Sequence, residues 1–348
     1  MKSDIKSMLL PELEEFFSSA GEQKFRAKQV FSWVHGGAVS FDEMSNISKS
    51  LRGKLDETFY ISSPSLISKN TSELDATTKF LWQMADGATV ESVVMQYSYG
   101  NTICISSQVG CRMGCTFCAS AIGGLERNLN ASEMLDQVLF SQKESGQKIS
   151  NVVIMGIGEP LDNFDNVIRF LKLINHSDGM NIGLRKITVS TCGIIENIDK
   201  LADYKIQLTL TVSLHAPDDE TRSKLMPINR KYGVDRLFEA CEKYFSKTGR
   251  RVSYEYSMID GVNDTRVHAE LLAKKLKGSG SHVNLIPLSD VPERTLKGSS
   301  TETIKEFSKI LEQCGINVTV RRSLGRDISA SCGQLRVRHK RSSFTEGS

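Results

Sequence analysis

The chain lacks both a strong excess of one charge and any long hydrophobic run. Its 44 Lys and Arg against 41 Asp and Glu leave a net charge of only +3. The composition therefore indicates no global polycation, and any nucleic-acid footprint must be a local patch. No apolar run approaches the length of a membrane span. The opening MKSDIKSMLL has no apolar core of a signal peptide and carries an acid at Asp4, so we expect a cytoplasmic protein with no membrane partner.

Internal repeats and low-complexity segments are also absent, and the composition is that of a globular protein. With 39% hydrophobic residues in 348, the chain can bury a sizeable core without disulfides. The cytoplasm keeps thiols reduced, so its eight cysteines indicate metal or redox chemistry. Simple burial is a sufficient explanation for Cys192, Cys241 and Cys314. It does not explain three cysteines within eight residues.

The first hundred residues predict two kinds of structure. Residues 1–60 have helical spacing, and the segment KFRAKQVFSWVHGG ends at the stop signal Gly36-Gly37. From about residue 77, three short runs alternate apolar and polar residues and are separated by turn signals. We therefore expect a small helical domain over 1–60 and a β-meander over 61–100.

From residue 101 to 341 the chain alternates between strand-like and helix-like segments. The β-rich runs are ICISS, NVVIMGIG, KITVSTCG, LTLTVSLH, VSYEYSMI and HVNLIPLS. They predict about six β/α units around a parallel sheet, open or barrel-shaped, with the chemistry at the carboxyl ends of the strands. A last strand, NVTVRR, leads into a basic stretch. From Arg321 to Arg341 it holds seven Lys or Arg against the single acid Asp327.

Cys111, Cys115 and Cys118 follow the first of these strands, in GCRMGCTFC. Four thiolates close a tetrahedral zinc site, whereas three leave a position open. A [4Fe–4S] cluster held by three cysteines keeps one iron free for a small ligand. The alternative is a zinc site completed by Cys104, which its position inside a strand disfavours. C-x3-C-x2-C after the first strand of a β/α series is typical of radical-SAM enzymes, in which S-adenosylmethionine binds the open iron.

The chain resembles the RlmN family of radical-SAM adenine C2-methyltransferases over residues 24–337. These enzymes modify 23S ribosomal RNA and, in many bacteria, transfer RNA. The resemblance is carried by GCRMGCTFCAS, GGLERNLNASEMLDQV, VIMGIGEPLDNFDNV, SLHAPDDETRSKLMPINRKY, IDGVNDTRVHAELLAKKLKG and SCGQLR.

This resemblance implies an α/β fold, the radical-SAM partial (β/α)6 barrel, with residues 1–60 as an RNA-binding accessory domain. It also implies a [4Fe–4S] cluster held by the three cysteines, two S-adenosylmethionine molecules per turnover, and a flavodoxin or ferredoxin as electron donor to a monomeric enzyme.

The resemblance also implies a mechanism. Adenine C2 is an electron-poor amidine carbon and does not attack a sulfonium methyl group directly. In the family, one S-adenosylmethionine methylates a cysteine, which corresponds to Cys332. A second one, cleaved at the cluster, yields a 5′-deoxyadenosyl radical that removes hydrogen from this methyl group, and the methylene radical then joins C2. Glu91 corresponds to the carboxylate that takes the C2 proton, and Cys104 to the cysteine that releases the product by forming a disulfide with Cys332.

Taken alone, each of these residues has a simpler explanation, and a lone cysteine such as Cys332 is more often a buried small apolar residue. Cys104 on an apolar strand is explained by core packing, and Glu91 by a solvent-facing strand position. Cys332 stands apart, because its Gly- and Arg-rich surroundings favour a thiolate. The resemblance further assigns contacts with S-adenosylmethionine to Gly158, Glu159, Ser190, Ser213, Leu214, His215 and Ser289.

One motif departs from the family. Members usually read NLIPxNP, where the second Asn contacts S-adenosylmethionine, but this chain reads NLIPLSDVPER, with Ser289 and Asp290 at those places. A hydroxyl is shorter than an amide and lacks its paired groups. Two other functions remain open at this point: a Cfr-like adenine C8-methyltransferase of 23S ribosomal RNA, and a non-catalytic, zinc-stabilised RNA-binding protein.

Overall fold

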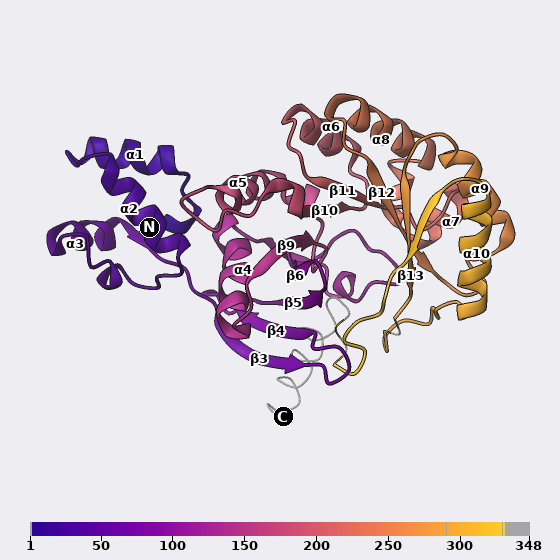
Figure 1. Cartoon of the computed structure of the whole chain (residues 1–348), viewed down its shortest axis with the longest axis horizontal. Helices are drawn as coiled ribbons and strands as arrows, with labels where there is room; N and C mark the ends of the chain where they lie inside the picture. The colour runs from indigo at the N-terminus through magenta and orange to yellow at the C-terminus, as the bar shows by residue number, and fades with distance from the viewer. Residues whose placement is uncertain (1, 290, 329, 331–348) are drawn as a thin grey trace.

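The computed structural model of the chain describes residues 2–289, 291–328 and 330. Two residues discussed above, Asp290 and Cys332, lie outside this described part. Figure 1 shows a helical lobe at the N-terminal end and a larger α/β body beside it. No helix in the described part is both long enough and apolar enough to cross a membrane.

The lobe is built from short helices closed by a small two-stranded sheet. Its elements are α1 (Leu10–Ser19), α2 (Phe25–His35), α3 (Lys49–Thr58), β1 (Ser3–Asp4) and β2 (Phe59–Tyr60). β1 and β2 pair in parallel and bring the two ends of the lobe together. α2 ends directly before Gly36 and Gly37, where the sequence places its stop signal.

A buried ion pair attaches the lobe to the α/β body. Lys6 Nζ lies 2.5 Å from Asp136 Oδ1, and both side chains are at most 1% exposed. Ser62 Oγ donates to the other oxygen of this carboxylate at 2.7 Å. Because either charge would be costly without the other, the pair specifies how the lobe docks.

One mixed sheet forms the centre of the α/β body. In chain order its strands are β3 (Ser65–Thr71), β4 (Thr78–Gln83), β5 (Thr89–Tyr97), β6 (Gly100–Ile105), β9 (Ile149–Ile154), β10 (Ile187–Thr191), β11 (Thr209–Ser213), β12 (Val252–Met258), β13 (His282–Pro287) and β14 (Asn317–Val320). Their spatial order is β14-β13-β12-β11-β10-β9-β6-β5-β4-β3. From β6 to β14 neighbouring strands are parallel, whereas β3 to β6 pair antiparallel.

The predicted β/α alternation is confirmed. The helices that follow the parallel strands are α4 (Ala131–Ser145), α5 (Phe164–Asn175), α6 (Ile195–Asp203), α7 (Asp219–Leu225), α8 (Val234–Thr248), α9 (Arg266–Leu276) and α10 (Thr301–Gln313). Figure 1 shows most of them along the outer face of the curved sheet. The predicted meander, β3 to β5, belongs to the same sheet as the barrel strands, and the division at residues 60 and 100 stays a prediction.

Side chains alternate between the two faces of the sheet, as strand geometry requires. On β6, Ile103 and Ile105 belong to the main apolar core beneath the helices, whereas Cys104 belongs to a separate small cluster with Val93 and Met95 of β5. We call the face that carries Cys104 the inner face. The predicted site residues on strands lie on this face or at strand ends.

After β14 the chain returns across the opening of the sheet. The carboxylate of Asp327 accepts hydrogen bonds from Ser72 Oγ at 2.7 Å and Glu73 N at 3.0 Å, in the turn between β3 and β4. Gly325 N donates to Asp75 Oδ2 in the same turn at 2.8 Å. This segment, residues 321–328 and 330, is called the strap below. It links the β14 edge of the sheet to the β3 edge (Figure 1).

Candidate active site

A tight hairpin positions the first cysteine. β7 (Gln108–Gly110) pairs antiparallel with β8 (Leu125–Asn128), and Cys111 N donates to Gly124 O at 2.9 Å. Gly110 has φ +76°, and a Cβ there would lie 1.9 Å from Gly124 O. Only glycine fits so close an approach, so the residue before Cys111 is dictated by the hairpin.

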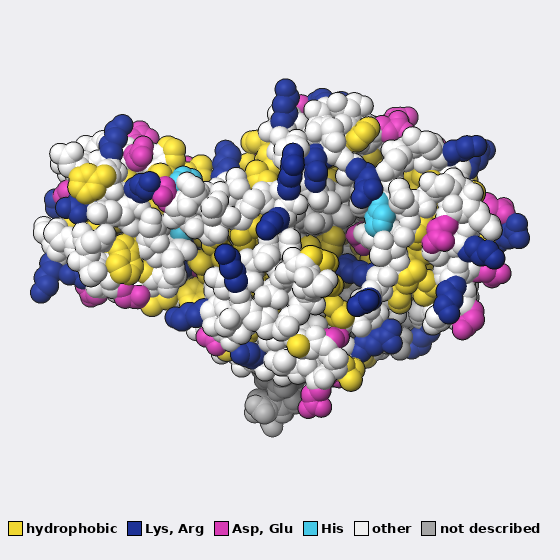
Figure 2. Space-filling view, viewed as in Figure 1, with side chains coloured by type: hydrophobic (Ala, Val, Ile, Leu, Met, Phe, Trp, Pro, Cys, Tyr) yellow, Lys and Arg dark blue, Asp and Glu magenta, His cyan; other side chains and the backbone are white. Residues whose placement is uncertain are grey.

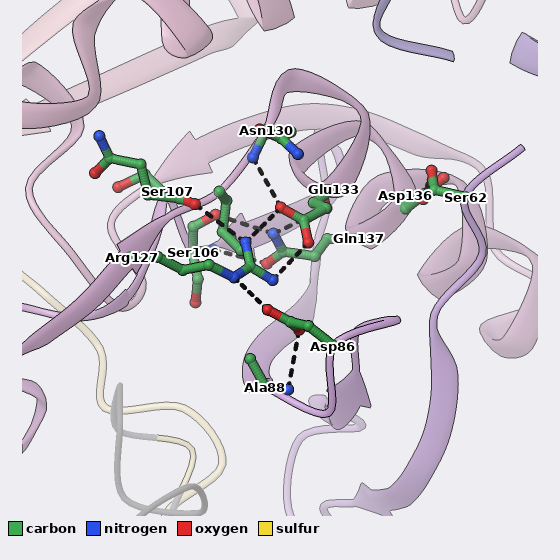
Figure 3. A network of polar contacts seen from close by, with 12 residues as sticks. Ser62, Asp86, Ala88, Ser106, Ser107, Arg127, Asn130, Glu133, Asp136 and Gln137 are labelled. Atoms are coloured by element: carbon green, nitrogen blue, oxygen red, sulfur yellow. Dashed lines mark hydrogen bonds and ion pairs between the residues drawn. The ribbon is translucent and has the colours of Figure 1, made fainter. Parts of the chain in front are cut away.

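The hairpin is attached to the body through Arg127 of β8, as Figure 3 shows. Arg127 makes a bidentate contact with Glu133, both N–O distances being 2.8 Å, and its Nε donates to Asp86 Oδ2 at 2.6 Å. Glu133 also accepts from Asn130 N at 2.8 Å and caps the start of α4. One guanidinium thereby joins the cysteine hairpin, α4 and the β4–β5 turn.

The three cysteines lie in one loop at the carboxyl end of β6. Cys111 is buried, and Cys115 and Cys118 are half-buried. Burial, followed by the field of Cys118, raises the pKa of the Cys111 thiol to about 12, and burial raises the pKa of Cys115 as well. Thiols in such a site ionise when a metal supplies positive charge.

Three cysteines in one loop are a donor set that a [4Fe–4S] cluster uses. In the described part of the chain, no three His, Cys, Asp or Glu side chains converge closely enough to hold one metal ion. The cysteines of a [4Fe–4S] cluster each bind a different iron, so they are spaced around the cluster. The surrounding apolar cluster of Leu225, Met226 and Ile259 also keeps water away from Cys115. When bound here, the cluster would be held by Cys111, Cys115 and Cys118.

The predicted Gly158–Glu159 turn lies very close to Gln108. Gly158 has φ +106°, and a Cβ there would lie 2.5 Å from Gln108 Cβ. Glu159 is 4% exposed; its Oε1 accepts from Leu161 N at 2.9 Å and its Oε2 from Cys192 N at 2.7 Å. Burial raises the pKa of Glu159. The side chains of Thr191 and Cys192 also hydrogen-bond to this carboxylate, which therefore joins the strand ends of β9 and β10.

The predicted Ser213-Leu214-His215 segment is fixed by the next strand. Leu214 N donates to Glu255 O at 3.0 Å, and His215 Nδ1 accepts from Ser257 N at 2.9 Å. Burial lowers the pKa of His215 to about 3. The ring is therefore neutral, and because Nδ1 accepts, its proton is on Nε2. His215 has φ +56°, a strained conformation for a side-chain-bearing residue.

Two further predicted contacts lie at neighbouring strands. Ser190 is half-buried on β10, in register with Thr211 of β11. Ser289 is exposed and lies two residues after the end of β13. The structure therefore brings the predicted cosubstrate residues to one end of the parallel strands, while their roles as ligands stay predictions.

Arg222 of α7 is a central residue that sequence reasoning missed. Its buried guanidinium donates to Leu214 O at 2.9 Å, Ser213 O at 3.1 Å, Cys192 O at 2.7 Å and Asn229 Oδ1 at 2.9 Å. It holds together backbone segments that carry predicted contacts. The only sequence signal was its place inside the family string SLHAPDDETRSKLMPINRKY.

Glu91 and Cys104 lie on neighbouring strands of the inner face. Glu91 of β5 is 3% exposed, and its Oε1 lies 3.7 Å from Nζ of Lys79, a fully buried residue of β4. Cys104 packs with Val93 and Met95 of β5, and Ala330 of the strap packs on this cluster. Glu91 is thus buried beside a cation rather than facing solvent. Lys79 was also missed, although a lysine within the apolar run TTKFLWQM is its sequence signal.

Lys and Arg side chains are prominent on one face of the described part (Figure 2). Figure 2 shows Lys and Arg side chains spread over the middle of one face, with acidic side chains mostly toward its two ends. Most of the basic stretch that the sequence singled out, from Arg321 to Arg341, lies outside the described residues. A hollow of about 650 Å³ in the lobe is lined by Phe25, Lys28 and Trp33, among others.

Comparisons with known proteins cover nearly the whole chain. The model of the Radical SAM superfamily matches residues 105–273, and that of the Ribosomal RNA large subunit methyltransferase N-terminal domain matches residues 3–61. Two curated relatives, both named "Probable dual-specificity RNA methyltransferase RlmN", come from Clostridium tetani and Clostridium novyi. The first is 50% identical over 99% of this chain and 98% of its own length, and the second is 52% identical over 96% and 97%. A solved radical SAM methyltransferase from Sphaerobacter thermophilus superposes with a TM-score of 0.90 at 42% identity, covering 95% of this chain and 98% of that one.

Proposed function

The chain belongs to the RlmN family of radical-SAM RNA methyltransferases, and on that premise we propose that it methylates C2 of an adenosine in 23S ribosomal RNA and in transfer RNA. The relatives from both Clostridium species carry dual specificity in their names, which supports two RNA substrates. A cytoplasmic location and a flavodoxin or ferredoxin as electron donor to a monomeric enzyme are part of the proposal.

The observation that carries the proposal is the placement of three separate sequence elements around one end of the sheet. The cysteine loop follows β6, Glu91 and Cys104 lie on the inner face of β5 and β6, and the strap packs Ala330 on the cluster that contains Cys104. Cys332 follows Ala330 by two residues. This arrangement supports a site in which Cys104, Glu91 and Cys332 act on one base.

Each residue has one role in the proposed reaction. When bound, the [4Fe–4S] cluster and two S-adenosylmethionine molecules supply the one-electron chemistry and the methyl group. Cys332 receives the methyl group, and its methylene carbon becomes bonded to C2. Glu91 accepts the proton that leaves C2, and Nζ of Lys79 lies 3.7 Å from its Oε1.

Product release is assigned to Cys104. Its thiolate attacks the sulfur of Cys332, an S–S bond forms, and the bond from that sulfur to the methylene carbon breaks. The electron pair of the broken bond stays with carbon, which takes up a proton and becomes the new methyl group. The disulfide must then be reduced before another turnover.

For RNA binding we propose the helical lobe together with the basic C-terminal stretch. Folded RNA is recognised largely through its shape and phosphates, and the Lys and Arg side chains over the middle of the face in Figure 2 suit that contact. The target adenine must leave its stack to reach the inner face.

An anaerobic assay with reconstituted enzyme, S-adenosylmethionine and a chemical reductant tests the function. Fragments of 23S ribosomal RNA and unmodified transfer RNA are offered separately, and the digested nucleosides are identified by mass spectrometry. We expect 2-methyladenosine from both RNAs. 8-Methyladenosine would overturn the C2 assignment in favour of a Cfr-like reaction. A colourless, zinc-containing protein that binds RNA without product would overturn catalysis altogether.

A further inference from the structure

The loop after β13 is tied down beside the cysteine loop. It spans residues 288–289 and 291–300 of the described chain. Lys297 O accepts from Asp260 N at 3.0 Å, which fastens one end of the loop to the segment after β12. Leu288 and Leu296 pack on the same small apolar cluster as Cys115. This loop contains Ser289, where the chain departs from the family pattern. It lies beside the cysteine loop.

Arg294 extends from this loop to the turn between Cys115 and Cys118. Its Nη2 donates to Cys118 O at 3.0 Å and lies 3.5 Å from Cys115 O. The turn has its own bond, from Cys118 N to Cys115 O at 3.3 Å. The guanidinium thus spans the backbone of two predicted cluster ligands. Its Nε is buried and finds no hydrogen-bond partner within the described part of the chain, which is unusual for so strong a donor.

The partners of Arg294 differ from those of the other cations around the cysteines. Arg222 is committed to four acceptors, and Arg112 forms an ion pair with Asp162. Arg294 has no carboxylate partner within the described residues. Among the residues that the structure describes, no carboxylate cancels its positive charge, and its guanidinium lies against the cysteine turn.

We propose that Arg294 is a positioning residue for the cluster: it holds the Cys115–Cys118 turn, and its charge favours the reduced cluster. A [4Fe–4S]²⁺ core with three thiolates carries one negative charge, and uptake of an electron adds a second. Net charge near a cluster is one of the levers that set its potential. The inference rests on the proposed function, because it requires a cluster on Cys111, Cys115 and Cys118.

The size of the effect follows from Coulomb's law. A unit charge within about 10 Å, at an effective dielectric constant of about 20, changes the reduction equilibrium roughly tenfold. For a one-electron couple, tenfold corresponds to about 59 mV. Removal of Arg294 should therefore make the cluster harder to reduce by about this amount, without touching any cysteine.

The test compares R294Q and R294K with the wild type and with R266Q. Arg266 is a matched control, because its side chain is 80% exposed on α9 and forms an ion pair with Glu270 of its own helix. Each full-length protein is reconstituted anaerobically and assayed for iron, for the EPR signal of the reduced cluster, and for its midpoint potential in a dye-mediated titration. Amide exchange of the apoproteins is measured at Cys118.

We expect R294Q to bind iron, to titrate with a potential lower by about 59 mV, and to exchange the Cys118 amide faster, while R294K retains most of the wild-type potential and R266Q all of it. Wild-type potential and wild-type exchange in R294Q would overturn the inference. If R294Q does not fold, R294K decides: an unchanged potential supports the role of charge, and a tenfold shift despite the retained charge refutes it. A wild-type protein without iron would instead refute the proposed function.

Discussion

Replacing Arg222 with methionine should loosen the candidate site and destabilise the whole protein. The guanidinium is fully buried and joins four acceptors: the carbonyls of Leu214, Ser213 and Cys192 and the side chain of Asn229. Methionine fills a similar volume but donates no hydrogen bond. The four acceptors would be left in a protein interior that water does not reach.

Two opposing terms decide the magnitude. Each buried acceptor left without a donor costs about 1–3 kcal/mol. Burial of the guanidinium lowers the pKa of Arg222, and burying its charge costs several kcal/mol. Removal of the guanidinium relieves this cost. Four such acceptors, less the relieved cost of the buried charge, leave an expected net loss of about 3–5 kcal/mol. With an unfolding entropy of about 2.1 cal/mol/K per residue, a chain of 348 residues that unfolds as one unit loses roughly 4–7 °C in Tm.

Differential scanning calorimetry of the reduced apoprotein measures this change. The controls are R222K, which keeps the charge but not the planar geometry, and R266Q on the exposed face of α9. We expect the order wild type, R266Q, R222K, R222M in falling stability. Calorimetric titration with S-adenosylmethionine should show affinity reduced at least about tenfold in R222M. An R222M protein within about 1 °C of the wild type would refute the reasoning, because it would mean that the four acceptors find other donors.

Three more predictions concern separate parts of the chain. C104A should leave protein covalently attached to RNA on a denaturing gel, because release requires the second thiol; free RNA with normal product would contradict this role. G158A should lower the free energy of unfolding in urea by at least about 2 kcal/mol, since its Cβ would lie 2.5 Å from Gln108 at φ +106°. G183A is the control, because a Cβ at Gly183 meets open space. Equal losses in the two variants would contradict the argument. Burial lowers the pKa of His35 from 6.5 to about 3, so its contribution to stability is present above pH 6.5 and is lost as pH falls toward 3. Between pH 7 and pH 5, the free energy of unfolding measured in urea should fall by about 2 kcal/mol less in H35F than in the wild type. An identical fall in both proteins would contradict this assignment.

Local periodicity was sufficient to predict the main elements of the fold. Alternation of apolar residues identified the six barrel strands, and the stop signal at Gly36 and Gly37 identified the end of α2, because both patterns depend on neighbours in sequence. The β7–β8 hairpin was not predicted as structure, although its letters GGLERNL were noticed. Its first strand is only three residues long, too short for alternation to be visible.

The candidate site was predictable where a motif names its residues, and not where partners come from distant segments. The spacing of Cys111, Cys115 and Cys118 identifies them as candidate ligands. Arg222 and Arg294 do not, since a buried arginine has no periodic signature and its acceptors are mainly backbone carbonyls. The partner of Arg294 in the cysteine turn lies 176 residues away in sequence, and only the folded chain brings the two together.

The strap has a consequence for how the enzyme is made. Its contact between Ser72 and Asp327 spans 255 residues of sequence, and it is made across the two edges of the sheet. During synthesis the N-terminal lobe, the meander and the cysteine loop leave the ribosome first, but the opening of the sheet stays unspanned until residue 327 has followed. The nascent chain thus presents its inner face, with Glu91 and Cys104, before the strap arrives. Arrival of the strap, rather than folding of the barrel, is the event that closes the site.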